Sequence, residues 1–488
     1  MTTNNNIKNK AISGLLWNFV ENGGNYLINF LIGLILIRII DARYFGLVGM
    51  MSFYILLGNV LATFSLSNYL IQKPQVKRED FSSSLWLNIF LSLLLYFGIF
   101  ISADWISQFY GESIIKDFIR IFGLNIIFSG LSVVQIADLS RKMNFKLMTQ
   151  INLISLLISG IIAIILAYLN HGLWSLIIFQ LSNTVLVFVL LWSLNKWDYG
   201  FSLSISTLRD IARFSWSIYL VNSINTLYTE IYNVIIGRLF KANQLAYYLR
   251  GKHTAEVLPI QFSNSLLKVF LPVMSSFQDD KENLRKTYHK VLMLTGLINI
   301  PILTFLAANG ESIFVLLYTE KWLSAVIFYQ LFCIEGMLLP LQLIGSNMLI
   351  AKGKGKAFMI LELSKRFTQT ILIFLTISSP QMMVVGLIIL SIVYTMVTFF
   401  IVKNESSYEV FDQIKYMIPY LIISFLIYLI NFYSTQILSE LNLILILIIN
   451  FVISLTFYLG ILILFKMESF TYIYEIVKLK IPFMKKAQ

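Results

Sequence analysis

The sequence is poor in residues that form covalent cross-links and metal centres. It contains one cysteine, Cys333, and three widely separated histidines, His171, His253 and His289. A single cysteine excludes a disulfide within the chain and a cysteine metal cluster, and so few histidines argue against a histidine site. We also find no nucleotide-binding loop and no nucleophile motif. The sequence therefore predicts no metal, no cofactor and no enzymatic or ATPase activity.

Charged residues are also scarce. They make up 13% of the 488 residues, whereas 58% are hydrophobic and the mean hydropathy is +0.77. Soluble proteins have about 25% charged and about 45–50% apolar residues. Long apolar runs recur from Ala11 to Lys466, and no polar stretch is long enough for a separate soluble domain. These features indicate an integral membrane protein and exclude a soluble enzyme with one membrane anchor.

The apolar runs predict an all-α membrane protein. A helix needs about 20 apolar residues to cross the roughly 30 Å hydrocarbon layer, which gives about fourteen transmembrane helices. The expected spans are 12–40, 45–71, 81–102, 114–138, 146–169, 173–194, 211–239, 245–276, 287–309, 323–350, 357–378, 382–402, 415–433 and 441–465.

The loops between these spans differ in basic charge. If the amino terminus is cytoplasmic, about 24 Lys and Arg residues lie in cytoplasmic segments and about 4 in the opposite loops, the latter being Arg43, Lys116, Lys241 and Lys321. This bias predicts that both termini are cytoplasmic, and the first span lacks the features of a removable signal peptide. It also accounts for the net charge of +12 without a nucleic-acid partner.

A second group of basic residues lies within the spans or at their ends. Charge at mid-bilayer costs about 2.5–3.5 kcal/mol, so such residues usually face a bundle interior or a water-filled cavity. Three of them, Arg38, Arg213 and Arg238, lie near span ends and are explained by snorkelling. The others are Arg120, Arg250, Lys252, Lys268, Lys365 and Arg366.

Two of these sites combine bases with carboxylates. Lys365 and Arg366 lie near the middle of span 357–378, with Glu362 placed to pair with Arg366 at i,i+4. Arg250, Lys252, His253 and Glu256 cluster early in span 245–276. Bases outnumber carboxylates in the spans, which predicts a cavity that prefers an anion.

The two halves of the chain show partial register. A shift of 200 residues aligns Arg38 with Arg238, Asn22 with Asn222 and Asn25 with Asn225. Since six helices separate the copies, both have the same orientation, which predicts two pseudo-symmetric six-helix lobes facing a central space. Coincidence among abundant residue types is the alternative.

Polar residues form a stripe on one face of the first span and another on the seventh. The first contains Asn18, Glu21, Asn22, Asn25 and Asn29, and the second contains Tyr219, Asn222, Asn225, Thr226, Thr229, Glu230 and Asn233. Such stripes either bond neighbouring helices or line a cavity. Glu335 in the tenth span and the intramembrane bases favour a cavity lining.

Several short motifs resemble one known family. They include Gly14-Leu15-Leu16-Trp17, Tyr44-Phe45-Gly46-Leu47-Val48, Leu70-Ile71-Gln72-Lys73, Phe109-Tyr110-Gly111, Gly172-Leu173-Trp174-Ser175-Leu176, Val234-Ile235-Ile236-Gly237-Arg238, Tyr247-Tyr248 with Arg250, Phe270-Leu271-Pro272, Gln278-Asp279-Asp280 and Thr319-Glu320-Lys321-Trp322. Their order and spacing resemble the polysaccharide-transporter branch of the multidrug/oligosaccharidyl-lipid/polysaccharide flippase superfamily, especially its WzxC-like lipopolysaccharide biosynthesis members. The resemblance covers most of the first twelve spans.

The resemblance implies a fold similar to multidrug-and-toxin-extrusion transporters, with a carboxy-terminal helix pair added. It implies a flippase in the bacterial inner membrane that moves an undecaprenyl-pyrophosphate-linked oligosaccharide repeat unit by alternating access. A polysaccharide polymerase and a chain-length regulator are the implied protein partners. Tyr232 departs from the family, because many relatives have an acidic residue there. An ion-coupling role for that acid is therefore not transferred.

These arguments give two sets of candidate site residues. The candidates for binding pyrophosphate are Arg250, Lys252, Lys365 and Arg366, followed by Arg120 and Lys268. The candidates for lining the cavity are Asn18, Glu21, Asn22, Asn25, Asn222, Asn225, Glu230, Glu256, Glu335 and Glu362.

Two other functions compete with the flippase. An ion-coupled multidrug or cation antiporter shares the architecture, but its cavity should be dominated by acids. A membrane polysaccharide polymerase needs a sizeable outer loop with catalytic residues, whereas the longest outer loops here are short.

The expected domains are an N-lobe at 1–200, a C-lobe at 201–405, a helix pair at 406–466 and a cytoplasmic amphipathic basic tail at 467–488. Aromatic and aliphatic residues in the tail alternate with lysines, which favours anchoring to membrane lipids.

Overall fold

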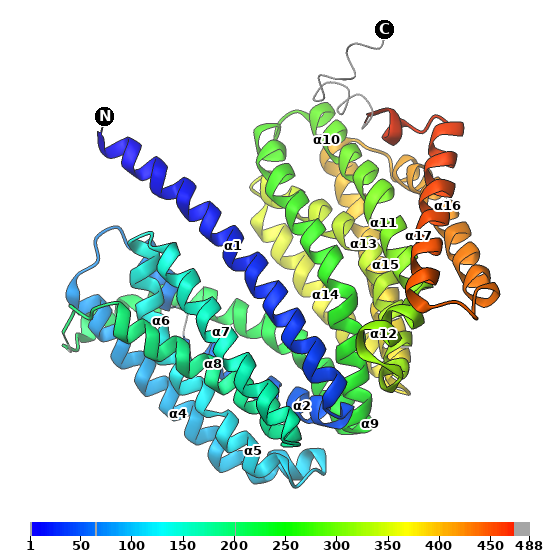
Figure 1. Cartoon of the computed structure of the whole chain (residues 1–488). Coiled ribbons are helices and arrows are strands. Elements are labelled where there is room, and N and C mark those ends of the chain that lie inside the picture. The colour runs from blue at the N-terminus through cyan, green and yellow to red at the C-terminus, as the bar shows by residue number, and fades with distance from the viewer. Residues whose placement is uncertain (1, 64–65, 201, 473–488) are drawn as a thin grey trace. The chain divides into compact units, whose positions relative to one another are not determined.

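Helices account for all the regular structure that the described residues contain. The computed structural model describes residues 2–63, 66–200 and 202–472, with the side chains of 2–16, 18, 19 and 217 outside the description (Figure 1). The predicted all-α class is confirmed. The basic tail beyond residue 472, with Lys478, Lys480, Lys485 and Lys486, lies outside the described residues.

Backbone contacts divide the chain into two compact units. The N-terminal unit is Met1–Ala246 and the C-terminal unit is Tyr247–Gln488. The long helix α9 (Ile205–Ser276) contributes to both units. The domain limits expected from the sequence stay a prediction.

The N-terminal unit is built on packed, nearly continuous apolar helices. They are α1 (Thr2–Ile39), α2 (Ala42–Thr63), α3 (Leu66–Gln72), α4 (Arg78–Tyr110), α5 (Ile115–Phe122), α6 (Leu124–Arg141), α7 (Phe145–Tyr168) and α8 (Gly172–Leu194). Helix α7 packs against α1 and α8, and α6 packs against α4 and α8. The side chain of Asn144 begins α7 by accepting a hydrogen bond from the Leu147 amide, and Gly111 ends α4 in a left-handed conformation.

The C-terminal unit continues from the second part of α9. Its further elements are α10 (Lys281–Leu294), the π-helix η1 (Thr295–Asn299), α11 (Ile300–Ala308), α12 (Gly310–Tyr318), the 3₁₀-helix η2 (Glu320–Ala325), α13 (Val326–Ala351), α14 (Gly355–Thr376), α15 (Pro380–Ser406), α16 (Val410–Ile437) and α17 (Leu443–Leu464). Helix α15 packs against α13 and α14, while α11 packs against α13 and α16. Helix α15 begins at Ser379, whose side chain accepts from the Met382 amide, followed by Pro380.

Helix α9 is interrupted at one residue. Lys241 has φ 70° and ψ 169°, which breaks the helix in the loop expected between the seventh and eighth spans. Gly46 of α2 lies directly against Ala242, the residue that follows Lys241. A Cβ added to Gly46 would be 1.8 Å from the carbonyl oxygen of Ala242. Only a glycine permits this approach of two backbones.

The expected fourteen spans differ from the apolar helices at two places. Twelve described helices or helix pairs are long and apolar enough to cross a membrane. One of these segments, Ile218–Ser276, contains both the seventh and eighth expected spans. Helix α14 is outside the twelve, because Glu362, Lys365 and Arg366 lower its apolar character. The count of fourteen is therefore close but not confirmed.

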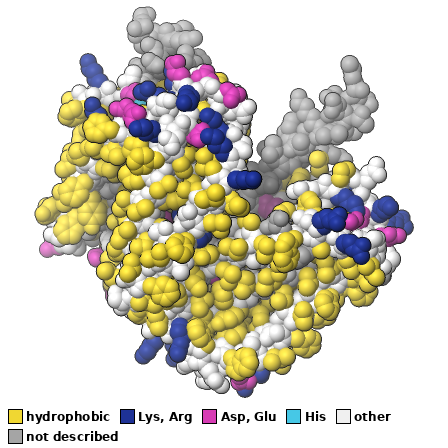
Figure 2. Space-filling view, turned by 180° about the vertical axis from the view of Figure 1, so that it is seen from behind, with side chains coloured by type: hydrophobic (Ala, Val, Ile, Leu, Met, Phe, Trp, Pro, Cys, Tyr) yellow, Lys and Arg dark blue, Asp and Glu magenta, His cyan; other side chains and the backbone are white. Residues whose placement is uncertain are grey.

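The outer surface is apolar in the manner of a membrane protein. Large hydrophobic side chains such as Phe90, Ile101, Phe374 and Phe425 are more than half exposed. Figure 2 shows hydrophobic side chains over most of one face, with Lys, Arg, Asp and Glu gathered in separate patches. So extensive an apolar surface needs lipid rather than water as its surroundings.

Candidate functional site

The C-terminal unit holds charged side chains between its apolar helices. On α14, the Lys365 ammonium is 4.0 Å from the ring centroid of Tyr394 on α15 and 3.3 Å from the side-chain oxygen of Gln342 on α13. The Tyr394 hydroxyl donates a 2.5 Å hydrogen bond to Glu362, one turn before Lys365. Arg366 donates to the Gln369 side chain at 3.1 Å. Side chains of two neighbouring helices, α13 and α15, thus contact the charged residues of α14.

Helices α9 and α13 add further charges to this group. Glu335 on α13 accepts a 3.0 Å hydrogen bond from Ser391 and interacts electrostatically with Lys365 and Lys252. Glu256 on α9 interacts with Lys252 and with Glu335. We call Lys252, Glu256, Glu335, Glu362, Lys365 and Arg366 the charged cluster. Three bases and three carboxylates from three helices meet in it, so a bound anion would need to compete with the carboxylates.

Arg250 occupies an aromatic site on the same helix. Its guanidinium lies 5.3 Å from the ring centroid of Tyr318 and 5.6 Å from that of Trp322. Trp322 is buried, and the Tyr318 hydroxyl lies 3.2 Å from the Thr254 hydroxyl. Such contacts hold a cation against the π faces of the rings. Arg250 therefore anchors α9 to α12 and η2.

The two secondary pyrophosphate candidates lie apart from the charged cluster. Arg120 belongs to α5 of the N-terminal unit, 3.7 Å from Asp104 and 4.6 Å from the Phe100 ring centroid. Asp104 also pairs with Lys116 at 2.7 Å. Lys268 is exposed on α9, four turns after Lys252. The roles of Arg120 and Lys268 in binding pyrophosphate stay predictions.

The polar stripe of α1 contacts α7. Glu21 accepts hydrogen bonds from Asn152 at 2.6 Å and from Thr149 at 3.1 Å. Asn22 is exposed and Asn25 is half-buried. The side chain of Asn18 lies outside the described residues. Glu21 of this stripe therefore bonds α1 to α7, and Asn25 and Asn29 line a cavity.

That cavity is rich in carboxamides. It has a volume of about 400 Å³ and lies among α1, α6, α7 and α8 of the N-terminal unit. We call it the amide pocket; its lining is Asn25, Asn29, Asn125, Asn152, Leu156, Phe179, Gln180, Asn183, Thr184 and Val187. Of the candidates predicted from the sequence it contains Asn25. Gln180, Asn183 and Thr184 follow a helical spacing within an apolar span, which is only a weak signal in the sequence.

Most polar residues of α9 in the N-terminal unit are exposed or half-buried. Asn222 and Asn225 are exposed, and Glu230 accepts a 2.5 Å hydrogen bond from Asn233. Tyr232, at the position where many family members carry an acid, is buried. The role of this second stripe as a cavity lining stays a prediction.

An apolar groove runs along the C-terminal unit. It has a volume of about 580 Å³ and almost no polar surface. Its walls come from α9, α11, α16 and α17 and include Leu258, Pro301, Phe305, Ile427, Phe451 and Leu459. Sequence reasoning missed this groove, because apolar residues that line a groove have the same pattern as those that face lipid.

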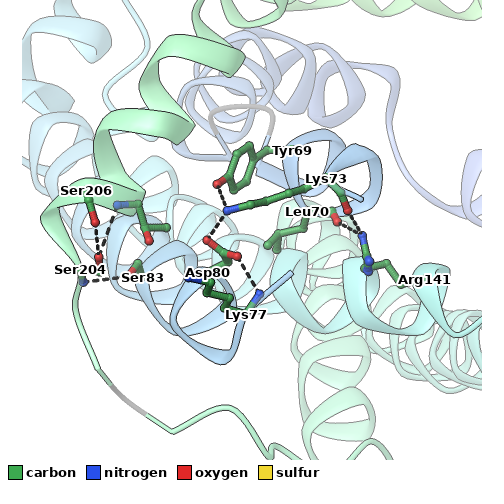
Figure 3. A network of polar contacts seen from close by, with 10 residues as sticks. Tyr69, Leu70, Lys73, Lys77, Asp80, Ser83, Arg141, Ser204 and Ser206 are labelled. Atoms are coloured by element: carbon green, nitrogen blue, oxygen red, sulfur yellow. Dashed lines mark hydrogen bonds and ion pairs between the residues drawn. The ribbon is translucent and has the colours of Figure 1, made fainter. Parts of the chain in front are cut away.

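A network of polar contacts holds the loop between α3 and α4 of the N-terminal unit in place. We expect this loop on the cytoplasmic side. Figure 3 shows the Lys73 ammonium between Tyr69 and Asp80, at 2.9 and 2.7 Å. Burial opposes the charge of Lys73, but its hydrogen bonds to Asp80 and Tyr69 outweigh that effect and raise its pKa. Arg141 donates to the carbonyl oxygens of Leu70 at 2.6 Å and of Lys73 at 2.7 Å.

A large cavity of about 1050 Å³ lies at the ends of α10 and α16. The His289 ring bridges the Tyr408 hydroxyl at 2.9 Å and Glu468 at 3.0 Å. Burial raises the pKa of Tyr408 to about 12, so this hydroxyl stays protonated at neutral pH. The cavity was not anticipated from the sequence. Among the described residues, no group of three or more His, Cys, Asp or Glu side chains is arranged to hold a metal ion.

The fold defines a class of membrane protein. A structure of the lipid II flippase MurJ in an inward closed conformation matches with a TM-score of 0.70 at 18% identity, covering 91% of this chain and 100% of that chain. An inward-facing multidrug resistance transporter of the MATE family, from the MOP superfamily, matches with a TM-score of 0.59 at 16% identity, covering 78% of this chain and 94% of that chain. The chain therefore has the helical fold of MOP-superfamily transporters.

The sequence then identifies the family. Residues 35–327 match the family described as "Polysaccharide biosynthesis protein", and the chain belongs to it. The lipopolysaccharide biosynthesis protein WzxC of Escherichia coli (strain K12) is 24% identical, covering 71% of each chain. A Klebsiella pneumoniae membrane protein of a cps region is 28% identical, covering 74% of each. The succinoglycan biosynthesis transport protein ExoT of Rhizobium meliloti (strain 1021) is 21% identical over 63% of each. The family resemblance drawn from the sequence motifs is confirmed.

Proposed function

We propose that this protein is a flippase for an undecaprenyl-pyrophosphate-linked oligosaccharide repeat unit, a precursor of O-antigen, capsule or exopolysaccharide. The observation that carries the proposal is the charged cluster, in which Lys252 lies in the candidate span Ile218–Ser276, and Lys365 and Arg366 lie on α14, which packs against the candidate spans of α13 and α15. Intramembrane charges are costly and usually serve a transported group or ion. The names of the relatives, which refer to polysaccharide biosynthesis and transport, support the same conclusion.

The chemistry of the substrate matches the charges. A pyrophosphate cannot enter hydrocarbon without compensation, and Lys and Arg donors form the strongest hydrogen bonds to phosphate oxygens. Lys365 lies against Tyr394 and Gln342 rather than in a tight ion pair, and Glu362 is occupied by the Tyr394 hydroxyl. In our proposal, the arriving pyrophosphate takes the positions that Gln342 and the nearby carboxylates hold around the cations. Alternating access then exposes the site first to the cytoplasmic and then to the outer side.

The apolar groove suits the lipid tail. The undecaprenyl chain has no polar group to satisfy, so it gains from contact with walls such as Phe305, Ile427 and Phe451. The groove and the charged cluster belong to the same unit and share helix α9, through Leu258 and Glu256. One unit thereby offers sites for both chemical ends of the lipid anchor.

The proposal includes a cellular setting. The protein would lie in the bacterial inner membrane with both termini in the cytoplasm. It would receive the lipid-linked unit on the inner leaflet, and a polysaccharide polymerase with its chain-length regulator would use the product on the outer leaflet.

Reconstitution tests the function directly. The purified protein is placed in liposomes containing lipid-linked repeat units extracted from the native host, and units that reach the opposite leaflet are removed by an enzyme that cannot cross the bilayer. We expect protein-dependent transfer from one leaflet to the other. No transfer above protein-free liposomes, together with ion-driven uptake of a lipophilic cation by the same preparation, would favour the antiporter instead.

A further inference from the structure

We propose that the amide pocket of the N-terminal unit binds an uncharged sugar residue of the glycan; this inference rests on the flippase function proposed above. The pocket is formed within one unit by four helices, α1, α6, α7 and α8. It is separate in residues and in chemistry from the charged cluster on α9, α13 and α14. Each would recognise a different part of one substrate.

As far as the structure describes it, the lining has hydrogen-bonding groups and no ionisable side chain. Six carboxamides and one hydroxyl contribute, together with three apolar side chains; the polar members are Asn25, Asn29, Asn125, Asn152, Gln180, Asn183 and Thr184. Each carboxamide has an acceptor oxygen and a nitrogen with two donor hydrogens. Sugar hydroxyl and acetamido groups also donate and accept, so an amide-lined site suits them. It has no cation for a phosphate and no carboxylate for a cationic drug.

The carboxylate of Glu21, which contacts the lining residue Asn152, is already occupied. Glu21 accepts hydrogen bonds from Asn152 at 2.6 Å and from Thr149 at 3.1 Å. The first of these bonds uses the Asn152 amide nitrogen and so fixes the orientation of this lining side chain. Glu21 thus orients a lining residue without itself lining the cavity.

Two of the carboxamides that line the pocket, those of Asn125 and Asn183, have unused hydrogen-bonding capacity. The Thr184 hydroxyl donates a 2.8 Å hydrogen bond to the Asn125 side-chain oxygen, which holds that amide in place with its nitrogen free to donate elsewhere. The side-chain oxygen of Asn183 is buried and has no hydrogen-bond partner. A buried carbonyl without a donor is costly, and in our proposal a turn of the Asn183 amide brings this oxygen to a sugar hydroxyl in the pocket.

The size and walls also fit a carbohydrate. The cavity of about 400 Å³ lies at the small end of the range of roughly 300–1,000 Å³ for ligand sites, enough for about one or two sugar rings. Phe179, Leu156 and Val187 add apolar surface to the polar lining. Sugar rings present C–H faces between their hydroxyls, and such walls can pack against them.

The test compares two lipids on the full-length protein in detergent. One probe is the lipid-linked repeat unit extracted from the native host, and the other is undecaprenyl pyrophosphate without sugar. The variants Asn183→Leu and Gln180→Met keep side-chain volume and remove the amide. The matched control is Asn59→Leu, which removes another buried, unpartnered amide oxygen of the N-terminal unit that does not line the pocket.

We expect each pocket variant to bind the glycosylated lipid about five- to tenfold more weakly, the effect of about one lost hydrogen bond, and to bind undecaprenyl pyrophosphate as the wild type does. Asn59→Leu should bind both lipids normally. The melting temperature of each variant shows that it is folded, and Gln180→Met decides the matter if Asn183→Leu does not fold.

Three results would overturn the pocket assignment, and a fourth would overturn the proposed function itself. Unchanged binding of both lipids, or equal loss for both, would exclude a glycan-specific role. A sodium-dependent gain in melting temperature that the pocket variants abolish, without a change in lipid selectivity, would assign the pocket to a cation. If the wild-type protein binds neither lipid, the proposed function itself fails, which separates that outcome from failure of the pocket assignment alone.

Discussion

The two units of this protein place different polar groups among their apolar helices. In the N-terminal unit carboxamides line the amide pocket, and ion pairs such as Arg43–Glu112 and Lys73–Asp80 lie at helix ends. In the C-terminal unit, which also holds an apolar groove, Lys365 and Glu335 lie within helices. Amides recognise neutral groups, whereas ammonium and guanidinium groups recognise anions. The difference suggests that one substrate with unlike parts is recognised by unlike units.

The energetic cost of the two arrangements also differs. A charge at mid-bilayer depth costs about 2.5–3.5 kcal/mol, whereas amides that bond to neighbouring helices are tolerated. The cost in the C-terminal unit is reduced by Tyr394, Gln342 and Ser391, each of which contacts a charged group. We therefore expect the charges to matter mostly for transport and the N-terminal ion pairs mostly for stability.

The largest effect is expected from removing two cations of the charged cluster. Lys365→Met combined with Arg366→Met should slow transfer of the lipid-linked unit in liposomes by about two orders of magnitude or more, because each charged hydrogen bond contributes roughly 1.5–3 kcal/mol. The matched control is Lys286→Met, which removes an exposed cation of the same unit that is not a site candidate and should transfer at the wild-type rate. Normal transfer by the double variant would remove the charged cluster from the mechanism.

The second-largest effect is expected from removing a charged side chain that stabilises the N-terminal unit. Arg141→Met removes the guanidinium that binds the carbonyl oxygens of Leu70 and Lys73. We expect a loss of roughly 1.5–3 kcal/mol of stability, seen as a lower melting temperature, with unchanged relative affinity for glycosylated and bare lipid. A change in that relative affinity without a change in melting temperature would contradict the comparison.

A smaller loss is expected at Glu21. The Glu21→Leu variant leaves the Asn152 amide without its acceptor, which should cost about 1–3 kcal/mol. Glu21→Gln keeps an acceptor and should retain most of the stability. Thermal unfolding of both variants in detergent checks the prediction, and equal melting temperatures for the two would show that the acceptor at Glu21 is not what stabilises α1 against α7.

The smallest effect is expected at Arg250. The Arg250→Lys variant keeps the charge but loses the planar group that lies against Tyr318 and Trp322. We expect a loss of about 0.5–2 kcal/mol of stability and little change in transport. Severe loss of transport by a variant with wild-type melting temperature would move Arg250 from an anchoring role into the substrate site.

Much of the fold was predictable because the bilayer imposes a helix length. The expected spans 146–169 and 173–194 agree with α7 and α8 to within one residue at each end. The break in α9 was expected from the basic loop residue Lys241, although not as a single residue with positive φ. Helix α14 satisfied our span estimate in spite of its charges and falls outside the stricter apolar count.

The candidate site was only partly predictable. Mid-span charge identified Lys365 and Glu335 as unusual, yet the contacts with Tyr394 and Ser391 depend on helix packing that no single helix pattern encodes. Asn25 was predicted to line a cavity, but its neighbours Asn152 and Asn183 come from spans whose few polar residues gave a weak signal. Periodicity gives the face of a helix and does not give the helix it meets.

The central claim is that the protein moves lipid-linked oligosaccharides between leaflets. The most direct measurement uses a deletion strain of the native host, with labelled lipid-linked oligosaccharides and a probe that cannot cross the inner membrane. We predict accumulation on the cytoplasmic side that the intact gene reverses and the Lys365→Met, Arg366→Met variant does not. Unchanged outer-leaflet levels in the deletion strain, in a host without a second flippase, would contradict the account.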